Sequence, residues 1–218
     1  MTRMPTLFIP HGGGPCFFME WDPPDTWDRH RSFLETLPAS LPEKPKALLV
    51  ISGHWEAREF TVQSNPAPPL LFDYNGFPQH TYELTWPAPG DPALATRVGE
   101  LLQGAGFETG TDTARGFDHG VFVPLKVAFP DAQIPTLQIS LKKGLDPQFH
   151  LELGEALAPL RHEGVLIVGS GMSFHNMRAM MAGGGRASAA REFDERLTSV
   201  CCDAPDACRG QLLRWQTL

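Results

Sequence analysis

Two histidines stand just after short apolar runs of the sequence. His11 follows TLFIP and opens the motif HGGGP, and His54 follows ALLVIS in the motif SGHW. In open α/β sheets the ligand crevice lies beyond the carboxyl ends of the strands, so side chains at two such ends can converge. Imidazole nitrogens suit a borderline divalent metal such as Fe(II) or Zn(II). The sequence therefore predicts one metal, bound by His11 and His54 after two adjacent strands.

Two further histidines lie in comparable places. His175 follows the run VLIVGSGMSF, and His119 stands in GFDHG before a stretch that we expect to be helical. A single histidine after a strand is more often a hydrogen-bonded structural residue, but four of them near glycines favour a site. The other histidines among charged or helical residues are interpreted as solvated: His30, His150 and His162.

The elements that must position these histidines alternate between strands and helices. TLFIP, ALLVIS, EFTVQS, TLQISL and VLIVG have the composition of strands, several of them apolar on both faces. Apolar stripes at helical spacing occupy residues 94–102 and 149–160, and each ends near a glycine. We expect one α/β domain over residues 1–218, with a central, largely parallel sheet flanked by helices and an active site at the carboxyl ends of the strands.

Residues 65–89 hold many prolines and aromatics without a sustained period, which is typical of a long functional loop. Phe77, Tyr82 and Trp86 in this loop could cover a substrate ring, although simple packing within the loop is an open alternative. His80, in the same loop, could also lie over the site. Residues 110–120 are expected to form a second loop, and residues 180–190 a connection.

Composition and charge exclude several classes of partner. The net charge is -7 and the pI is about 5.6, and no cluster of Lys and Arg suggests a nucleic-acid surface. The apolar runs are much shorter than the roughly 20 residues that cross a bilayer. The first residues, MTRMPTLFIPHGGGP, lack the features of a secretion signal. We therefore expect a cytoplasmic protein that binds neither nucleic acid nor membrane.

Five motifs in order resemble one family: HGGGP, SGHW, GFP-x-x-x-Y (residues 76–82), GFDHG and SG-x-x-x-HN (residues 170–176). They resemble the DOPA 4,5-dioxygenase type of the class III extradiol ring-cleavage dioxygenases, over residues 6–176. The resemblance implies one non-haem metal per chain, usually Fe(II) and in some members Zn(II), with His11 and His54 as ligands. It also implies that His175 is the active-site histidine and that His119 lies next to the ligands without binding the metal itself. The implied reaction opens a catechol ring with O2, in the catabolism of aromatic compounds.

Members of this family take a further ligand from a C-terminal P-x-E-H motif, which residues 1–218 do not contain. Two histidines hold a divalent ion weakly, so we expect His175 to act as a third ligand here. In the family role His175 is the base that takes a proton from the catechol, and a base engaged by the metal cannot do so. The expected cost is weak metal binding and slow ring cleavage, while His119 helps to polarise oxygen or substrate.

Other functions stay open beside the dioxygenase. Zinc has no redox chemistry and would support hydrolysis through an activated water. A homologue that binds metal without turnover is a second alternative, since fold does not fix function. HGGG also occurs in esterase oxyanion holes, but the nearest match to a G-x-S-x-G elbow, VGSGM, lacks the first glycine. The dioxygenase is the interpretation that accounts for all the motifs.

Overall fold

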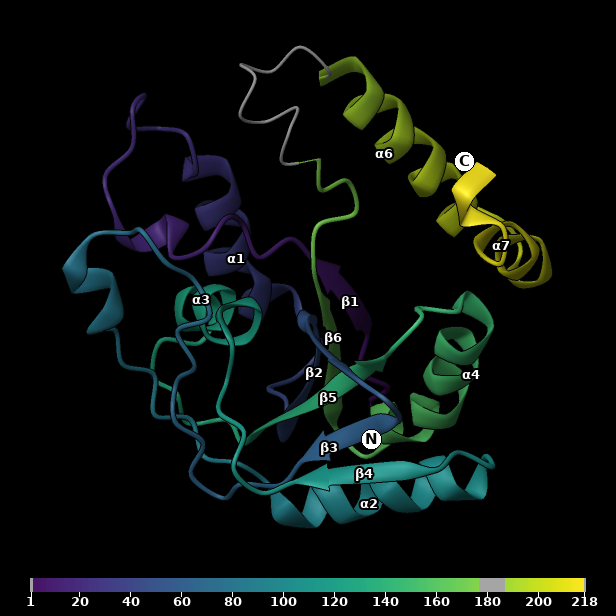
Figure 1. Cartoon of the computed structure of the whole chain (residues 1–218). Helices are drawn as coiled ribbons and strands as arrows, with labels where there is room; N and C mark the ends of the chain where they lie inside the picture. Colours follow the sequence, from purple (N-terminus) through teal and green to yellow (C-terminus); the bar gives the residue numbers. More distant parts are fainter. Residues whose placement is uncertain (1, 177–186, 218) are drawn as a thin grey trace.

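The computed structural model describes residues 2–176 and 187–217, which fold around a six-stranded sheet (Figure 1). Four strands run parallel to one another, and the two strands at one edge run antiparallel to these four. The predicted α/β fold with a largely parallel sheet is confirmed. In order across the sheet, the strands are β1 (Thr6–Ile9), β6 (Val165–Ser170), β2 (Ala47–Ala57), β5 (Thr136–Lys142), β3 (Phe60–Gln63) and β4 (Thr109–Asp112).

The order of the strands differs from the one expected at the site. β6 pairs with β1 on one side and with β2 on the other, so the strands that carry His11 and His54 are not adjacent. Ser170, at the end of β6, is level with both Ile9 and Ser52. The prediction of adjacent strands is wrong because β6 comes from a distant part of the chain, and local sequence patterns do not reveal such an insertion. The carboxyl ends still meet at one edge of the sheet.

Both faces of the central strands are covered, which explains the continuous apolar run at the start of β2. Leu48 and Val50 pack into one cluster with α1 (Asp28–Ser40) and α3 (His119–Ala128). Leu49, on the other face, packs with α2 (Pro92–Gly104) and α4 (Pro147–Leu157). Each such side chain contributes about 1.5–3 kcal/mol through burial. The central strands that position the histidines are thus held between two apolar clusters.

The two predicted helical stripes correspond to α2 and α4. In both helices an aspartate caps the N-terminus and a proline is the first helical residue. Asp91 accepts a hydrogen bond from the Leu94 N–H at 2.9 Å, and Asp146 accepts one from the Gln148 N–H at 2.8 Å. The following proline has no N–H to satisfy and suits the first helical position. α4 continues as a 3-10 turn, Ala158–His162, and the chain then reverses at Gly164, whose φ is +90°.

Several elements lie outside the sequence predictions. β4 falls partly within the predicted loop 110–120, because its sequence TGTD has no apolar residue and forms the edge of the sheet. α1 buries only Leu34 and Leu37, which is too few for a clear stripe. Of the predicted connection 180–190, residues 180–186 lie outside the described residues, whereas residues 187–190 belong to α6 (Ala187–Cys202). α6 is followed by α7 (Pro205–Leu212).

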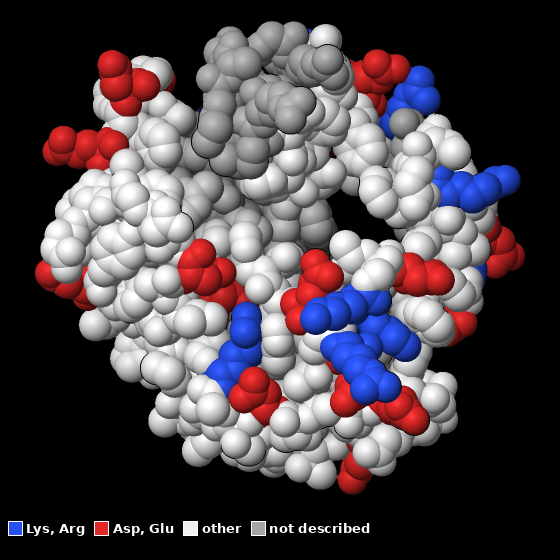
Figure 2. All heavy atoms as spheres, viewed as in Figure 1, with Lys and Arg blue, Asp and Glu red and all other residues white. Residues whose placement is uncertain are grey.

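Two features of the structure bear on possible partners: the length and hydropathy of its helices, and the distribution of charge on its surface. Across residues 2–176 and 187–217, no helix is both long and apolar enough to span a lipid bilayer. Figure 2 shows that basic side chains on the face in view lie beside acidic ones. Pairs such as Arg97 with Glu163, at 2.9 Å, are examples of this intermixing.

Candidate metal centre

Three histidines from three different elements converge at the carboxyl edge of the sheet. His11 lies two residues beyond β1, and His119 is the first residue of α3. His54 lies inside β2 rather than after it, at a point where the pairing of β2 with β5 shifts register between Ile51 and Glu56. The register shift lets the side chain turn toward the end of the sheet. One ligand atom from each of the three rings lies within 4.8 Å of the other two.

The spacing of the ring nitrogens fits a single metal ion. The Nε2 atoms of His11 and His54 are 3.0 Å apart. Two nitrogens bound at about 2.1 Å and at a right angle around one ion lie about 3.0 Å from each other. The ring of His119 lies with its centroid 3.9 Å from that of His54 and 5.3 Å from that of His11. The donor set therefore suits a divalent ion that accepts imidazole ligands.

The hydrogen bond at Nδ1 of His11 leaves a lone pair on its Nε2 atom. The Nδ1 atom of His11 lies 3.2 Å from the Ser170 hydroxyl oxygen. That hydroxyl donates its single proton to the carbonyl of Gly120, so its oxygen must accept from His11. Nδ1 then carries the ring proton of His11, and the lone pair of Nε2 points at His54.

Burial keeps two of the rings neutral. Burial, and then the neighbouring His54 and His119, lower the pKa of His11 to about 3. Burial also lowers the pKa of His54, as does His119, while Asp73 partly opposes this shift. Metal ions bind neutral imidazole, so neither ring has to lose a proton near neutral pH before it can act as a ligand.

A buried polar network supports the segment around His54. The carboxylate of Asp118, which has no exposure to solvent, accepts hydrogen bonds from Ser52 at 2.7 Å and Arg115 at 3.0 Å. The Ser52 oxygen in turn accepts from the backbone N–H of His54 at 3.2 Å. Arg115 also lies over the Trp55 ring, 4.3 Å from its centroid. Sequence reasoning missed Asp118, although its place beside His119 in GFDHG was a usable signal.

Comparisons with known proteins identify the family to which this site belongs. The sequence model described as "Catalytic LigB subunit of aromatic ring-opening dioxygenase" matches residues 5–205. The chain belongs to this LigB family. The match bears out the resemblance that the five motifs predict.

Individual proteins that are similar in sequence to this chain support the assignment. The chain is 43% identical over 172 residues to a 4,5-DOPA dioxygenase extradiol of Beta vulgaris, covering 78% of this chain and 62% of that protein. It is 38% identical over 179 residues to a 4,5-DOPA dioxygenase extradiol of Escherichia coli K12 (82% and 63% covered). Dioxygenase tasH of Hapsidospora irregularis is 40% identical over 195 residues (83% and 58% covered). The chain thus spans about three fifths of the length of these relatives.

A solved structure shows the same fold as this LigB-family chain. The crystal structure of an uncharacterized protein of Escherichia coli K12 superposes with a TM-score of 0.75 at 31% sequence identity. The superposition covers 99% of this chain and 80% of the other.

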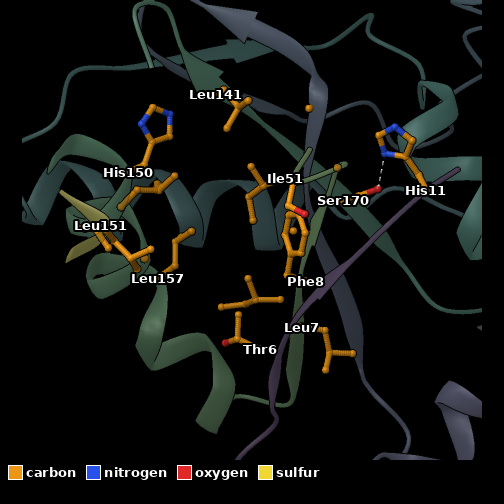
Figure 3. A pocket seen from close by; sticks show the side chains of 18 of the residues that line it. Thr6, Leu7, Phe8, His11, Ile51, Leu141, His150, Leu151, Leu157 and Ser170 are labelled. Atoms are coloured by element: carbon orange, nitrogen blue, oxygen red, sulfur yellow. Dashed lines mark hydrogen bonds between the residues drawn. The ribbon is translucent and has the colours of Figure 1, made fainter. Parts of the chain in front are cut away.

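His175, the predicted third ligand, is not a member of the three-histidine group, but it lies near enough to contribute to the lowered pKa of His11 and of His54. It follows β6, is exposed, and borders a groove of about 1020 Å³ that also touches His11 and His54. Figure 3 shows His11 at one side of this groove and His150 at the other, with Phe8 and Ile51 between them. The structure therefore brings His119, rather than His175, to the other two histidines. The ligand role of His175 stays a prediction.

The predicted substrate-loop residues occupy two different environments. Trp86 is only 2% exposed, and its indole N–H donates to the Phe129 carbonyl at 3.0 Å. This placement agrees with the packing alternative for Trp86. Phe77 is half-buried, and its ring lies so close to Gly14 that a Cβ on that glycine would be 2.7 Å from the ring. Phe77 therefore packs against the HGGGP turn.

Tyr74, which sequence reasoning missed, separates the other loop aromatics from the histidines. Its ring centroid lies 5.8 Å from that of His119, 5.4 Å from that of Phe77 and 5.3 Å from that of Tyr82. The Tyr74 hydroxyl donates to the Thr81 carbonyl at 2.6 Å, which fixes the ring in place. Phe77 and Tyr82 thus contact Tyr74, and Tyr74 in turn contacts His119.

The interpretation of His30 and His150 as solvated holds only in part, because each side chain is half-buried. The Nε2 atom of His30 lies 2.7 Å from the carbonyl oxygen of Pro10, the residue before His11, and burial lowers the pKa of His30. The Nε2 atom of His150 accepts from the Lys142 N–H at 3.3 Å. The apolar carbon atoms of each ring pack against the protein, while the ring nitrogens form hydrogen bonds with the backbone. Charged neighbours in the sequence do not reveal such bonds. His80, 2.9 Å from the Phe18 carbonyl, lies outside the three-histidine group.

Proposed function

We propose that the chain is the catalytic part of a non-haem metal-dependent dioxygenase that opens a catechol ring next to its hydroxyls with O2. The observation that carries this proposal is the pair of Nε2 atoms 3.0 Å apart, on His11 and His54, in a member of a ring-opening dioxygenase family. The names of the relatives, 4,5-DOPA dioxygenase extradiol, support a catecholic substrate. We further propose one divalent ion per chain, Fe(II) for activity.

His11 and His54 would hold the metal through Nε2, with His119 within reach as a third nitrogen ligand. Bound Fe(II) would supply open positions where a catecholate and O2 can meet. His175 borders the same groove from its exposed position, and we assign it the removal of a proton from a catechol hydroxyl. Its role as a ligand is the less supported proposal, since it lies outside the group.

The groove beside the histidines suits an aromatic ring. Its lining includes Phe8, Ile51 and Leu141, so water around a bound ring would be displaced by apolar side chains. Displacing water strengthens the electrostatic interactions between the site and a charged substrate. Tyr74 packs against His119, with the ring centroids 5.8 Å apart, and is not one of the residues that line this groove.

Zinc-dependent hydrolysis is a second candidate, favoured by one observation. Within residues 2–176 and 187–217, the group that could hold a metal consists of three histidines without a carboxylate. Three histidines form the donor set of zinc sites that activate water, whereas non-haem Fe(II) oxygenases commonly use two histidines and one carboxylate. A homologue that binds metal without turnover would show the same donor set.

One experiment separates these functions. The chain, loaded anaerobically with Fe(II) or with Zn(II), is assayed for O2 uptake with a panel of catechols that includes DOPA, and for ester hydrolysis. We expect O2 uptake with Fe(II) alone. Ester hydrolysis with Zn(II) and no O2 uptake would favour the hydrolase, and metal binding without either activity would favour the non-catalytic homologue.

Variants test the residues. His11→Ala and His54→Ala should each abolish stoichiometric metal, whereas His162→Ala, an exposed histidine outside the site, should retain it. Full retention of metal in the His11→Ala/His54→Ala double variant would overturn the proposed site. Cytoplasmic location and a role in aromatic catabolism remain predictions from the sequence.

A further inference from the structure

The carboxylate of Asp73 contacts two of the three histidines. Its Oδ1 atom accepts hydrogen bonds from both the ring Nδ1 and the backbone N–H of His119, at 2.8 Å and 2.9 Å. Its Oδ2 atom lies 3.8 Å from the Nδ1 of His54. Asp73 thus stands behind the group, on the side away from the Nε2 atom of each ring.

The protein holds Asp73 in this position through the backbone. The loop that carries Asp73 is paired with the segment before α3: the Phe117 N–H donates to the Pro69 carbonyl at 2.8 Å, and the Leu71 N–H donates to the Phe117 carbonyl at 2.7 Å. These two bonds fix the loop two residues before Asp73 and two residues before His119. The contact between Asp73 and His119 therefore follows from the architecture.

The geometry also defines which nitrogen of His119 carries its proton. Oδ1 accepts from the backbone N–H of His119, so it acts as an acceptor. The Nδ1 atom at 2.8 Å from the same oxygen must then be a donor. In a neutral ring the proton on Nδ1 leaves a lone pair on Nε2. A ring held at both its backbone and its side chain by one oxygen has little freedom to rotate.

We propose that Asp73 is a positioning residue that holds His119 in the Nδ1–H tautomer, with Nε2 available to the site formed with His11 and His54. A carboxylate that orients a histidine in this way fixes the tautomer and raises the basicity of the ligand nitrogen. The consequence for metal binding rests on the proposed function, whereas the tautomer can be measured in the metal-free chain.

A purely structural role for Asp73 makes different predictions. A carboxylate near the first residue of α3 also stabilises the helix N-terminus through the helix dipole. Loss of that interaction would lower stability without changing the tautomer of His119. Asp91 supplies a matched control, because it accepts a hydrogen bond at the N-terminus of α2 and lies outside the metal-binding group.

The test compares Asp73→Ala, Asp73→Asn and Asp91→Ala in the full chain. Long-range proton–nitrogen NMR spectra of ring-labelled histidines report the tautomer of His119, with His119→Ala used for assignment. We expect Nδ1–H in the unmodified chain and in Asp91→Ala, and a shift toward Nε2–H in Asp73→Ala. Asp73→Asn keeps a carbonyl acceptor and should retain Nδ1–H. Competition with a chromophoric chelator should show Zn(II) affinity about 10–100-fold lower in Asp73→Ala.

Results from the unmodified chain and from Asp73→Ala would overturn the inference. One is an Nε2–H tautomer in the unmodified chain, which tests the proposal even if Asp73→Ala fails to fold. The other is an unchanged tautomer in folded Asp73→Ala, or a loss of Zn(II) affinity no larger than in Asp91→Ala. If the His11→Ala/His54→Ala double variant keeps its metal, the proposed function fails, while the tautomer measurement still decides the role of Asp73.

Discussion

At Gly120 a single added methyl group should disturb the candidate metal centre. It is the second residue of α3, and its hydrogen faces the segment of β2 that carries His54. A Cβ on Gly120 would lie 2.4 Å from the Ser52 Oγ and 3.1 Å from the Cδ2 atom of the His54 ring. The Ser52 hydroxyl must move, because real Cβ atoms do not come so close to another heavy atom, and the His54 ring must give by a few tenths of an ångström. Gly120→Ala should therefore move both Ser52 and the ring of His54.

The expected magnitude follows from three contributions. Overpacking a buried site costs about 1–3 kcal/mol. Displacing Ser52 weakens its 2.7 Å hydrogen bond to the buried Asp118, at a further cost of about 1–3 kcal/mol. Alanine returns at most about 1 kcal/mol in helix propensity. We expect a net loss of about 3 kcal/mol, which lowers Tm by about 6–12 °C in a domain of this size.

The assay combines thermal unfolding with a Zn(II) competition titration. Displacement of the His54 ring should also reduce Zn(II) affinity by about tenfold or more. Gly99→Ala in α2 is the matched control, since a Cβ there meets no atom within 4 Å and should stabilise the chain by up to about 1 kcal/mol. If Gly120→Ala were as stable as Gly99→Ala and bound Zn(II) as tightly as the unmodified chain, the close packing described around His54 would be wrong.

Three further predictions concern the acid stability, the aromatic loop and a helix cap. Burial places the pKa of His11 at about 3, below its ordinary value of 6.5, so the unfolded chain binds a proton that the folded chain does not. As the pH decreases from 6.5 toward 3, the free energy of unfolding should therefore fall by up to about 1.4 kcal/mol per pH unit. In urea denaturation at several pH values, His11→Gln should show a flatter slope. Trp86→Phe should cost about 1–2 kcal/mol through loss of the bond to Phe129, with Zn(II) affinity unchanged in a competition titration; a lower affinity would place Trp86 at the site. Asp91→Ala should cost about 1 kcal/mol in thermal unfolding because it removes the cap of α2, and an unchanged Tm would contradict the capping role.

The sequence predicts those parts of the fold whose physics is local. The start of β2 is a run of apolar residues because both of its faces are covered, and α2 has a stripe because only one side faces the sheet. The position of β6 between β1 and β2 depends on pairing between distant segments, which no local pattern records. β4 was missed for a related reason, since an edge strand with the sequence TGTD needs no apolar residue.

The same distinction applies to the site. His11 and His54 were predictable because each lies near the end of an apolar run, beside glycine. The position of His119 in the group depends on the pairing of Phe117 with the loop before Asp73, a contact between segments more than forty residues apart in the chain. His175 follows a strand in the sequence as His11 does, yet the turn after β6 places it at the border of the groove.

The charges around the three histidines bear on the kind of ligand that the site would accept. The rings of His11 and His54 are neutral near pH 7, because burial lowers the pKa of each. Asp118 is buried nearby, but its carboxylate is paired with Arg115 at 3.0 Å, so it contributes little net charge. Asp73 faces the group with a carboxylate that two N–H groups of His119 hold in place. One carboxylate would balance half the charge of a divalent ion, so a site built from neutral imidazoles would favour an anionic chelating ligand, the class to which the proposed catecholate belongs.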